Sequence, residues 1–148
     1  MGSKSNSLEE GMLDLLFLNI PLTLVGDAAG LLASAAPGSL YIGLHTADPG
    51  EAGDQSTSET AYTGYARVAV ARSGAGWSRT GSVVSNVAVV DHGKCTASPG
   101  AALTHFSIGA ELAGAGRLLY SGDIPGTIVM AVNVIPHLVI GALTATEG

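Results

Sequence analysis

Hydrophobic residues repeat with two different periods along the chain, and the period changes near residue 38. In SLEEGMLDLLFLN the apolar side chains recur every three or four residues, which is the spacing of one helix face. We predict a helix over residues 8–19, capped by Ser7 with Glu10 as its capping-box partner and ended by Pro21. A second short helical turn is expected within residues 27–36. The apolar stripe of the predicted helix comprises Leu8, Met12, Leu15 and Leu16.

A helix of this length is marginal in isolation, so its apolar stripe must dock on another surface. That surface is either its own domain or a neighbouring subunit, and the sequence leaves both alternatives open. The change of period divides the chain into an N-terminal helical arm, residues 1–37, and a domain formed by residues 38–148.

From Ser39 onward, apolar and polar positions alternate in short runs separated by glycine- and proline-containing turns, which is the pattern of β-strands. About eight strands are predicted, over residues 39–46, 65–72, 77–80, 82–90, 103–110, 116–124, 126–134 and 137–146. The Ile-Pro-Gly at 124–126 is interpreted as a turn. Because no helical stretches separate the strands, the predicted class is mainly β, an antiparallel β-sandwich or jelly roll.

The composition fits a subunit that associates with other proteins. Apolar residues make up 47% of the 148 residues and charged residues only 12%, about half the usual share. The net charge is −6, with eight of the twelve acids in residues 1–59, and no basic stripe is present. We therefore expect no nucleic-acid partner.

The first apolar run does not have the features of an export signal or a membrane span. Glu9 and Glu10 stand where a signal peptide carries positive charge, and Asp14 and Pro21 interrupt the run. Cys95 is the only cysteine, which excludes an intramolecular disulfide. We expect a protein made in the cytoplasm, with no export signal and no membrane partner.

The acidic loop after the first predicted strand is the one candidate metal site. Asp48, Glu51 and Asp54 recur every third residue, and a calcium ion takes six to eight oxygen ligands from such a loop. Only three carboxylates are offered, and the spacing is not that of an EF-hand. A turn explains Ala-Asp-Pro-Gly more simply, since Pro49 fixes φ and Gly50 accepts a left-handed φ. We predict no metal and no cofactor.

Catalytic motifs are not found, and the four histidines lie in different predicted elements. A hydrolase that uses His45 with Asp48 is the enzymatic alternative. We expect a non-enzymatic protein.

Three stretches resemble a family of small virion proteins encoded by tailed phages and prophages. They are LYIGLHTADPGEAG, TSETAYTGYARVAVARSGAGW and THFSIGAELAGAGRLLYSG, and the resemblance extends from about Leu8 to Thr146. Ile42-Gly43 departs from the family pattern, which has a larger second residue. The positions that mark the fold are His45, Asp48, Pro49, Gly50, Tyr65, Ala66, Arg67 and Trp77.

The resemblance implies a jelly-roll-like sandwich that works by assembly and has no catalytic residues. Its implied role is that of a cement or decoration protein, which binds the outside of the capsid and clamps neighbouring capsomers. The implied partners are the major capsid protein and further copies of the chain, as a dimer or a trimer. The helix stripe Leu8, Met12, Leu15 and Leu16 is the predicted contact.

A tail-tip or fibre-type module that binds a host glycan is the alternative role. Such a module would use exposed aromatic rings, for which Tyr41, Tyr62, Tyr65 and Trp77 are the candidates, although Trp77 is more simply a core residue.

Overall fold

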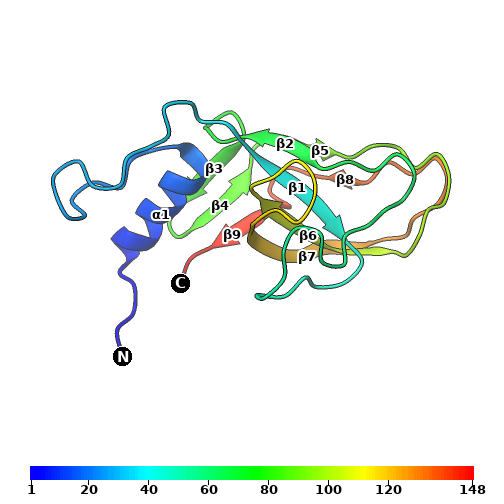
Figure 1. Ribbon diagram of the computed structural model, residues 1–148, viewed down its shortest axis with the longest axis horizontal. Helices are drawn as coiled ribbons and strands as arrows, with labels where there is room; N and C mark the ends of the chain where they lie inside the picture. The colour runs from blue at the N-terminus through cyan, green and yellow to red at the C-terminus, as the bar shows by residue number, and fades with distance from the viewer.

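The computed structural model describes all residues, 1–148, and the protein is mainly β with one helix. The predicted antiparallel, sandwich-like class is confirmed (Figure 1). The helix is α1 (Asn6–Leu18), and the strands are β1 (Ser39–His45), β2 (Val68–Ala71), β3 (Trp77–Thr80), β4 (Val83–Asn86), β5 (Val90–Asp91), β6 (Leu103–Gly109), β7 (Leu118–Ile128), β8 (His137–Leu138) and β9 (Thr144–Thr146).

Three antiparallel sheets form the body of the protein. The largest has the order β2-β1-β6-β7, the second β3-β4-β9, and the third joins β5 to β8. In the largest sheet Ile42 pairs with Ile108 and Leu44 with Phe106, and all four side chains are buried. These cross-strand pairs place the core between this sheet and the segments that cover it.

Helix α1 packs on β3 and β4 and belongs to the same core as the sheets (Figure 1). Leu13 and Phe17 are fully buried. The predicted helix is confirmed, but the predicted cap is wrong: Ser5 precedes the first turn, and its Oγ accepts from the Leu8 N–H at 3.4 Å. No helix is long and apolar enough to span a lipid bilayer.

The predicted second helical turn is absent. Residues 20–33 instead form a loop that projects beside α1, at the left of Figure 1, and we call it the arm loop. Asn19 and Ser34 clamp its base through two hydrogen bonds of 2.9 Å, and Leu22 bridges Leu31. Gly26 and Gly30 have φ values of +81° and +67°, so the backbone between them cannot continue a helix.

Strand β7 runs through the Ile-Pro-Gly that was predicted to be a turn. Pro125 lacks an N–H, but it lies where the pairing of β6 with β7 shifts register: His105 pairs with Asp123 and Leu103 with Ile128, so residues 124–127 have no paired residue on β6. The two strands predicted on either side of residues 124–126 are therefore a single strand of eleven residues that ends at Ile128.

Candidate functional site

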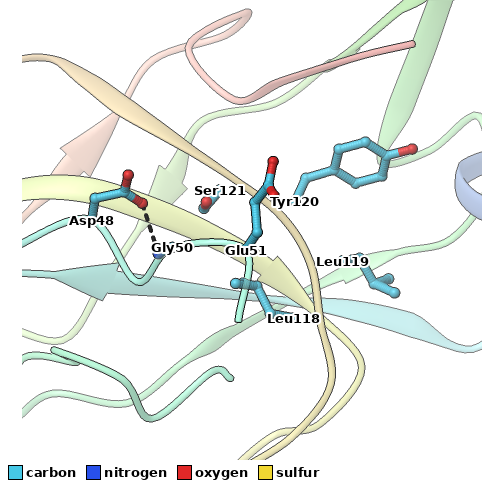
Figure 2. A pocket seen from close by; sticks show the side chains of 7 residues that line it. All are labelled: Asp48, Gly50, Glu51, Leu118, Leu119, Tyr120 and Ser121. Carbon is cyan, nitrogen blue, oxygen red and sulfur yellow. Dashed lines mark hydrogen bonds between the residues drawn. The ribbon is translucent and has the colours of Figure 1, made fainter. Parts of the chain in front are cut away.

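The loop between β1 and β2 begins with the predicted turn. Asp48 Oδ1 accepts from the Gly50 N–H at 2.9 Å, and Gly50 has a φ of +72°. Beyond the turn, Asp48 and Glu51 line a hollow of about 460 Å³ whose other wall is the first half of β7, residues 118–121 (Figure 2). The turn prediction is confirmed, and it places two carboxylates at the edge of a polar hollow.

The three candidate metal ligands do not come together. Asp54 Oδ1 accepts from the Ser56 N–H at 2.7 Å and from the Ser56 hydroxyl at 2.6 Å, and these bonds lower the pKa of the Asp54 carboxyl. Asp54 is not among the residues that line the hollow with Asp48 and Glu51. No group of three or more His, Cys, Asp or Glu side chains is arranged to hold a metal ion.

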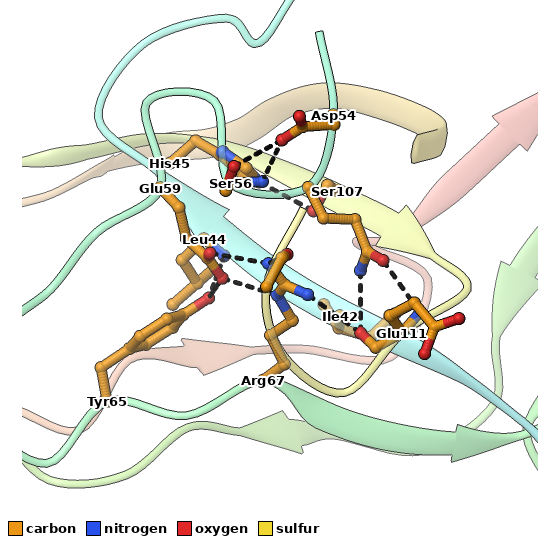
Figure 3. Close-up of polar contacts among 12 residues, drawn as sticks. Ile42, Leu44, His45, Asp54, Ser56, Glu59, Tyr65, Arg67, Ser107 and Glu111 are labelled. Atoms are coloured by element: carbon orange, nitrogen blue, oxygen red, sulfur yellow. Dashed lines mark hydrogen bonds and ion pairs between the residues drawn. The ribbon is translucent and has the colours of Figure 1, made fainter. Parts of the chain in front are cut away.

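His45 is buried at the end of β1 and is bound at both ring nitrogens (Figure 3). Nδ1 lies 2.8 Å from the Thr57 carbonyl oxygen, so it carries the proton and donates. Nε2 then accepts from the Ser107 hydroxyl at 2.7 Å. Because both nitrogens are occupied, His45 does not act with Asp48 as the hydrolase alternative requires.

The Ser107–His45 pair has the hydrogen bond of a nucleophile and its base. Both residues are 0% exposed, however, and burial lowers the pKa of His45. Gly43 is the residue at which the chain departs from the family pattern. A Cβ at this position would lie 2.7 Å from Ser107 Oγ, so the glycine leaves room for the hydrogen bond between Ser107 and His45. The pair ties β1 to β6 inside the sheet, where no substrate reaches it.

A buried ion pair lies on the other side of the loop (Figure 3). The side chain of Arg67 is 2% exposed and binds both carboxylate oxygens of Glu59, Nε to Oε1 at 2.7 Å and Nη2 to Oε2 at 2.8 Å. The remaining donors reach the carbonyl oxygens of Glu111 at 3.0 Å and Gly114 at 2.7 Å. The Tyr65 hydroxyl donates to Glu59 Oε1 at 2.7 Å, and burial is the main cause of its raised pKa.

Gln55 completes this network, and it was missed from the sequence. Residues 55–60 are a polar run between two predicted strands, a pattern typical of a surface loop, but Gln55 is 0% exposed. Its Oε1 accepts from the Glu111 N–H at 2.8 Å, and its backbone N–H donates to Gly116 at 3.0 Å. A Cβ on Gly109 would lie 2.0 Å from Gln55 Cδ, so the side chain of Gln55 fits only because residue 109 is glycine. The glycines of SIGAELAGAG are the sequence feature that indicates this close approach.

His92 is a second buried imidazole, and it makes a single hydrogen bond. Its ring is stacked on Tyr65, and Nε2 lies 3.1 Å from the Ile42 carbonyl oxygen while Nδ1 has no partner. Burial lowers the pKa of His92 from 6.5 to about 4. Protonation would place an N–H in the core with no acceptor.

We expect the protein to lose stability as the pH falls from 6.5 toward 4, because the unfolded state then binds a proton at His92 that the folded state does not. The loss attributable to His92 is about 3 kcal/mol at its limit, and stability is retained above pH 6.5. Urea unfolding between pH 7 and about pH 4.5 measures this loss. His92→Gln keeps a donor and cannot titrate, so its stability should vary less with pH. Equal pH dependence in both proteins would contradict the expectation.

The predicted contact stripe lines an apolar hollow rather than an open face. Leu8, Met12, Leu15 and Leu16 meet Leu22, Val25 and Leu31 of the arm loop around a space of about 250 Å³, lined only by hydrophobic residues. Of the four helix residues, Leu8 is the most accessible, at 37% exposed. The adjacent face of α1, with Leu13 and Phe17, is the one buried on its own domain, and Leu16 packs against the same core.

The aromatic side chains do not form an exposed platform. Of the four candidates for a glycan groove, Tyr62 and Trp77 are buried, and Tyr41 and Tyr65 are half-buried. The exposed large hydrophobic residues are aliphatic or methionine, with Leu24 at 81%, Val129 at 76% and Leu32 at 71%.

Comparison with known proteins identifies the family of the chain. No curated protein matches the chain. The family model described as Podophage GP4 fiber I protein gp80 matches residues 3–146, which is nearly the whole sequence. The match covers α1, all three sheets and the loop between β1 and β2, which we call the motif loop. The chain therefore belongs to the podophage GP4 fiber I protein gp80 family and is a structural protein of a phage virion.

Proposed function

We propose that this virion protein is a cement subunit that binds the outside of the capsid and clamps neighbouring capsomers. Its partner would be the major capsid protein. The observation that carries the proposal is the nature of the exposed apolar surface, which is aliphatic and gathers in two segments, α1 with the arm loop and residues 129–140; only the first forms an all-apolar hollow. Aliphatic surface suits a permanent protein contact, because its burial stabilises an interface without specific polar partners.

The buried network around the motif loop supports the same role. Gln55, Glu59 and Arg67 tie the loop to residues 111–116, so the loop is held rigidly on the sheets. A subunit that must clamp a shell benefits from a surface that loses little conformational entropy on binding.

A fibre-type module is the second candidate, because the matching family is described as a fiber protein. Its glycan-binding form is disfavoured by the aromatic side chains, none of which is exposed. A fibre subunit that binds only other virion proteins would use the same aliphatic surface, and location in the particle separates the two roles.

Binding to empty shells that lack the protein tests the proposal. We expect the purified chain to co-sediment with shells and not with isolated tails. Leu8→Arg should weaken shell binding at least about tenfold, because it places a charge at the mouth of the apolar hollow. Leu8→Met keeps the hollow apolar and should bind as the wild type does.

Exclusive binding to tails would overturn the capsid role, and equal binding by Leu8→Arg would overturn the role of the hollow. Cryo-electron microscopy of the purified particle provides the independent measurement of location.

A further inference from the structure

Strand β2 forms an open edge of the largest sheet. The Arg72 N–H donates to the Gly38 carbonyl at 3.0 Å, on the side of β1. Because backbone groups alternate along a strand, the N–H groups of Ala69 and Ala71 and the Ala69 carbonyl point the other way, where no strand is hydrogen-bonded to β2. Such an edge is a template for a further strand.

An apolar groove of about 370 Å³ lies along this edge, between β2 and residues 88–91. Nine of its ten lining residues are glycine, alanine or valine. The tenth, Asp91, is hydrogen-bonded to His137 and its side chain is 57% exposed, so its carboxylate lies in water at the edge of the groove. Small side chains and unpaired backbone groups together fit an extended segment that carries large aliphatic side chains.

The arm loop is a segment of that kind. It carries five aliphatic side chains between 44% and 81% exposed, namely Ile20, Leu24, Val25, Leu31 and Leu32. The backbones of Leu22 and Leu31 are hydrogen-bonded to each other. The N–H groups of residues 23–25, between them, donate no backbone hydrogen bond. Its one carboxylate, Asp27, already accepts from the Gly30 N–H at 2.8 Å.

Backbone strain is found at the most exposed of these residues. Leu24 has a φ of +64°, a left-handed conformation that is unfavourable for a branched side chain. An isolated subunit thus holds Leu24 both strained and in water. Docking of the loop in an extended conformation would relieve both costs.

We propose that the arm loop of one copy of this chain docks along the β2 edge of a second copy, with Leu24 inserted into the groove of small residues. If each copy docks its arm loop on the β2 edge of the other, the dimer has two-fold symmetry. Every contact then occurs twice, and two loops and two grooves are buried. Stable interfaces bury about 1,600 Å² in total, and ten aliphatic side chains from two loops contribute to such an area. Val25 and Leu31 of the arm loop also line the hollow proposed to bind the shell, so the two contacts are told apart by variants: Leu8→Arg changes the hollow, and Ala69→Lys changes only the β2 edge.

The oligomeric state of the full chain, measured by light scattering and analytical ultracentrifugation, is the first test. We expect a dimer or a closed ring. Leu24→Gly should weaken self-association at least about tenfold while keeping or raising the melting temperature, because glycine adopts a positive φ without strain. Ala69→Lys should weaken it by placing a charge on the open edge. Ala61→Lys, at an exposed alanine in the loop before β2, is the matched control and should leave it unchanged.

Cross-linking tests which surfaces meet. Cys95 is buried, so engineered cysteines can be oxidised selectively. A tagged Leu24→Cys chain mixed with an untagged Ala69→Cys chain should give a disulfide-linked heterodimer, since bridged cysteines need Cα atoms within about 7 Å. A monomer at every concentration, or an oligomer that neither Leu24→Gly nor Ala69→Lys weakens, would overturn the proposal. Weakening by Leu24→Gly alone, without the heterodimer, would place the loop elsewhere and overturn the β2 site. The shell-binding test compares Leu8→Arg with Leu8→Met and changes neither Leu24 nor Ala69, so the two proposals can fail separately.

Discussion

Replacing Arg67 by alanine is expected to lower the free energy of unfolding by about 3–5 kcal/mol. The variant leaves the Glu59 carboxylate, 17% exposed, without its cation, and it removes one of two donors from the carbonyl oxygens of Glu111 and Gly114. Removing one partner of a buried pair costs this much because the other charge stays desolvated. A small domain is stable by about 5–15 kcal/mol, so the variant is expected to be close to unfolding. Urea denaturation of the purified variant measures the loss.

Two further variants separate the ion pair from the hydrogen bonds. Arg67→Lys keeps the charge but cannot bind both oxygens of Glu59 and reach two carbonyl groups, so an intermediate loss is expected. Glu59→Gln combined with Arg67→Met should cost less than the sum of the single changes, because it removes both charges together. A loss below about 1 kcal/mol for Arg67→Ala would show that the pair behaves as a surface salt bridge.

Replacing Phe17 by alanine is the second large effect we expect, with a loss of about 3–5 kcal/mol. Phe17 is fully buried, and its ring meets Trp77 edge-on at a centroid distance of 4.8 Å and Tyr120 at 5.5 Å. A helix of 13 residues is marginal without packing, so α1 should detach when this contact is lost. The near-ultraviolet circular dichroism of Trp77 should weaken together with the helical signal.

Leu32→Ala is the matched control for Phe17→Ala, because Leu32 is 71% exposed and leaves no cavity when shortened. Its stability should stay within about 0.5 kcal/mol of the wild type. Equal losses in the two variants would show that α1 does not belong to the core. For the same reason, deleting residues 1–37 would remove Leu13 and Phe17 from the core, and the Leu8 variants are the cleaner test of shell binding.

The sequence was a good guide where a local pattern has one physical solution. The alternation of Leu40, Ile42 and Leu44 predicts β1 because successive side chains in a strand face opposite sides. The helical spacing of residues 8–16 predicts α1, and Asp48-Pro49-Gly50 predicts a turn from conformational preferences alone. The predicted cap, Ser7, is wrong because either serine could accept a hydrogen bond from the first turn. In the structure the helix begins at Asn6, so Ser5 is the residue that caps it.

The sequence was a poor guide where the solution depends on distant neighbours. Pro125 predicts a turn, yet it lies within β7 because the pairing with β6 shifts register there and requires no N–H from residue 125. Gln55 reads as a surface residue, yet residues 111–116 cover it.

The sequence by itself determined the mainly β class, the positions of most strands and the helix, because these follow from periods of two and 3.6 residues. Only the tertiary structure decided which polar residues are buried. His45 and Ser107 lie 62 positions apart and Arg67 and Glu111 lie 44 apart, and no local pattern encodes such pairs. It also decided that one face of α1 belongs to the core, while the arm loop and the edge of β2 stay open to a partner, because burial depends on which segments meet in space.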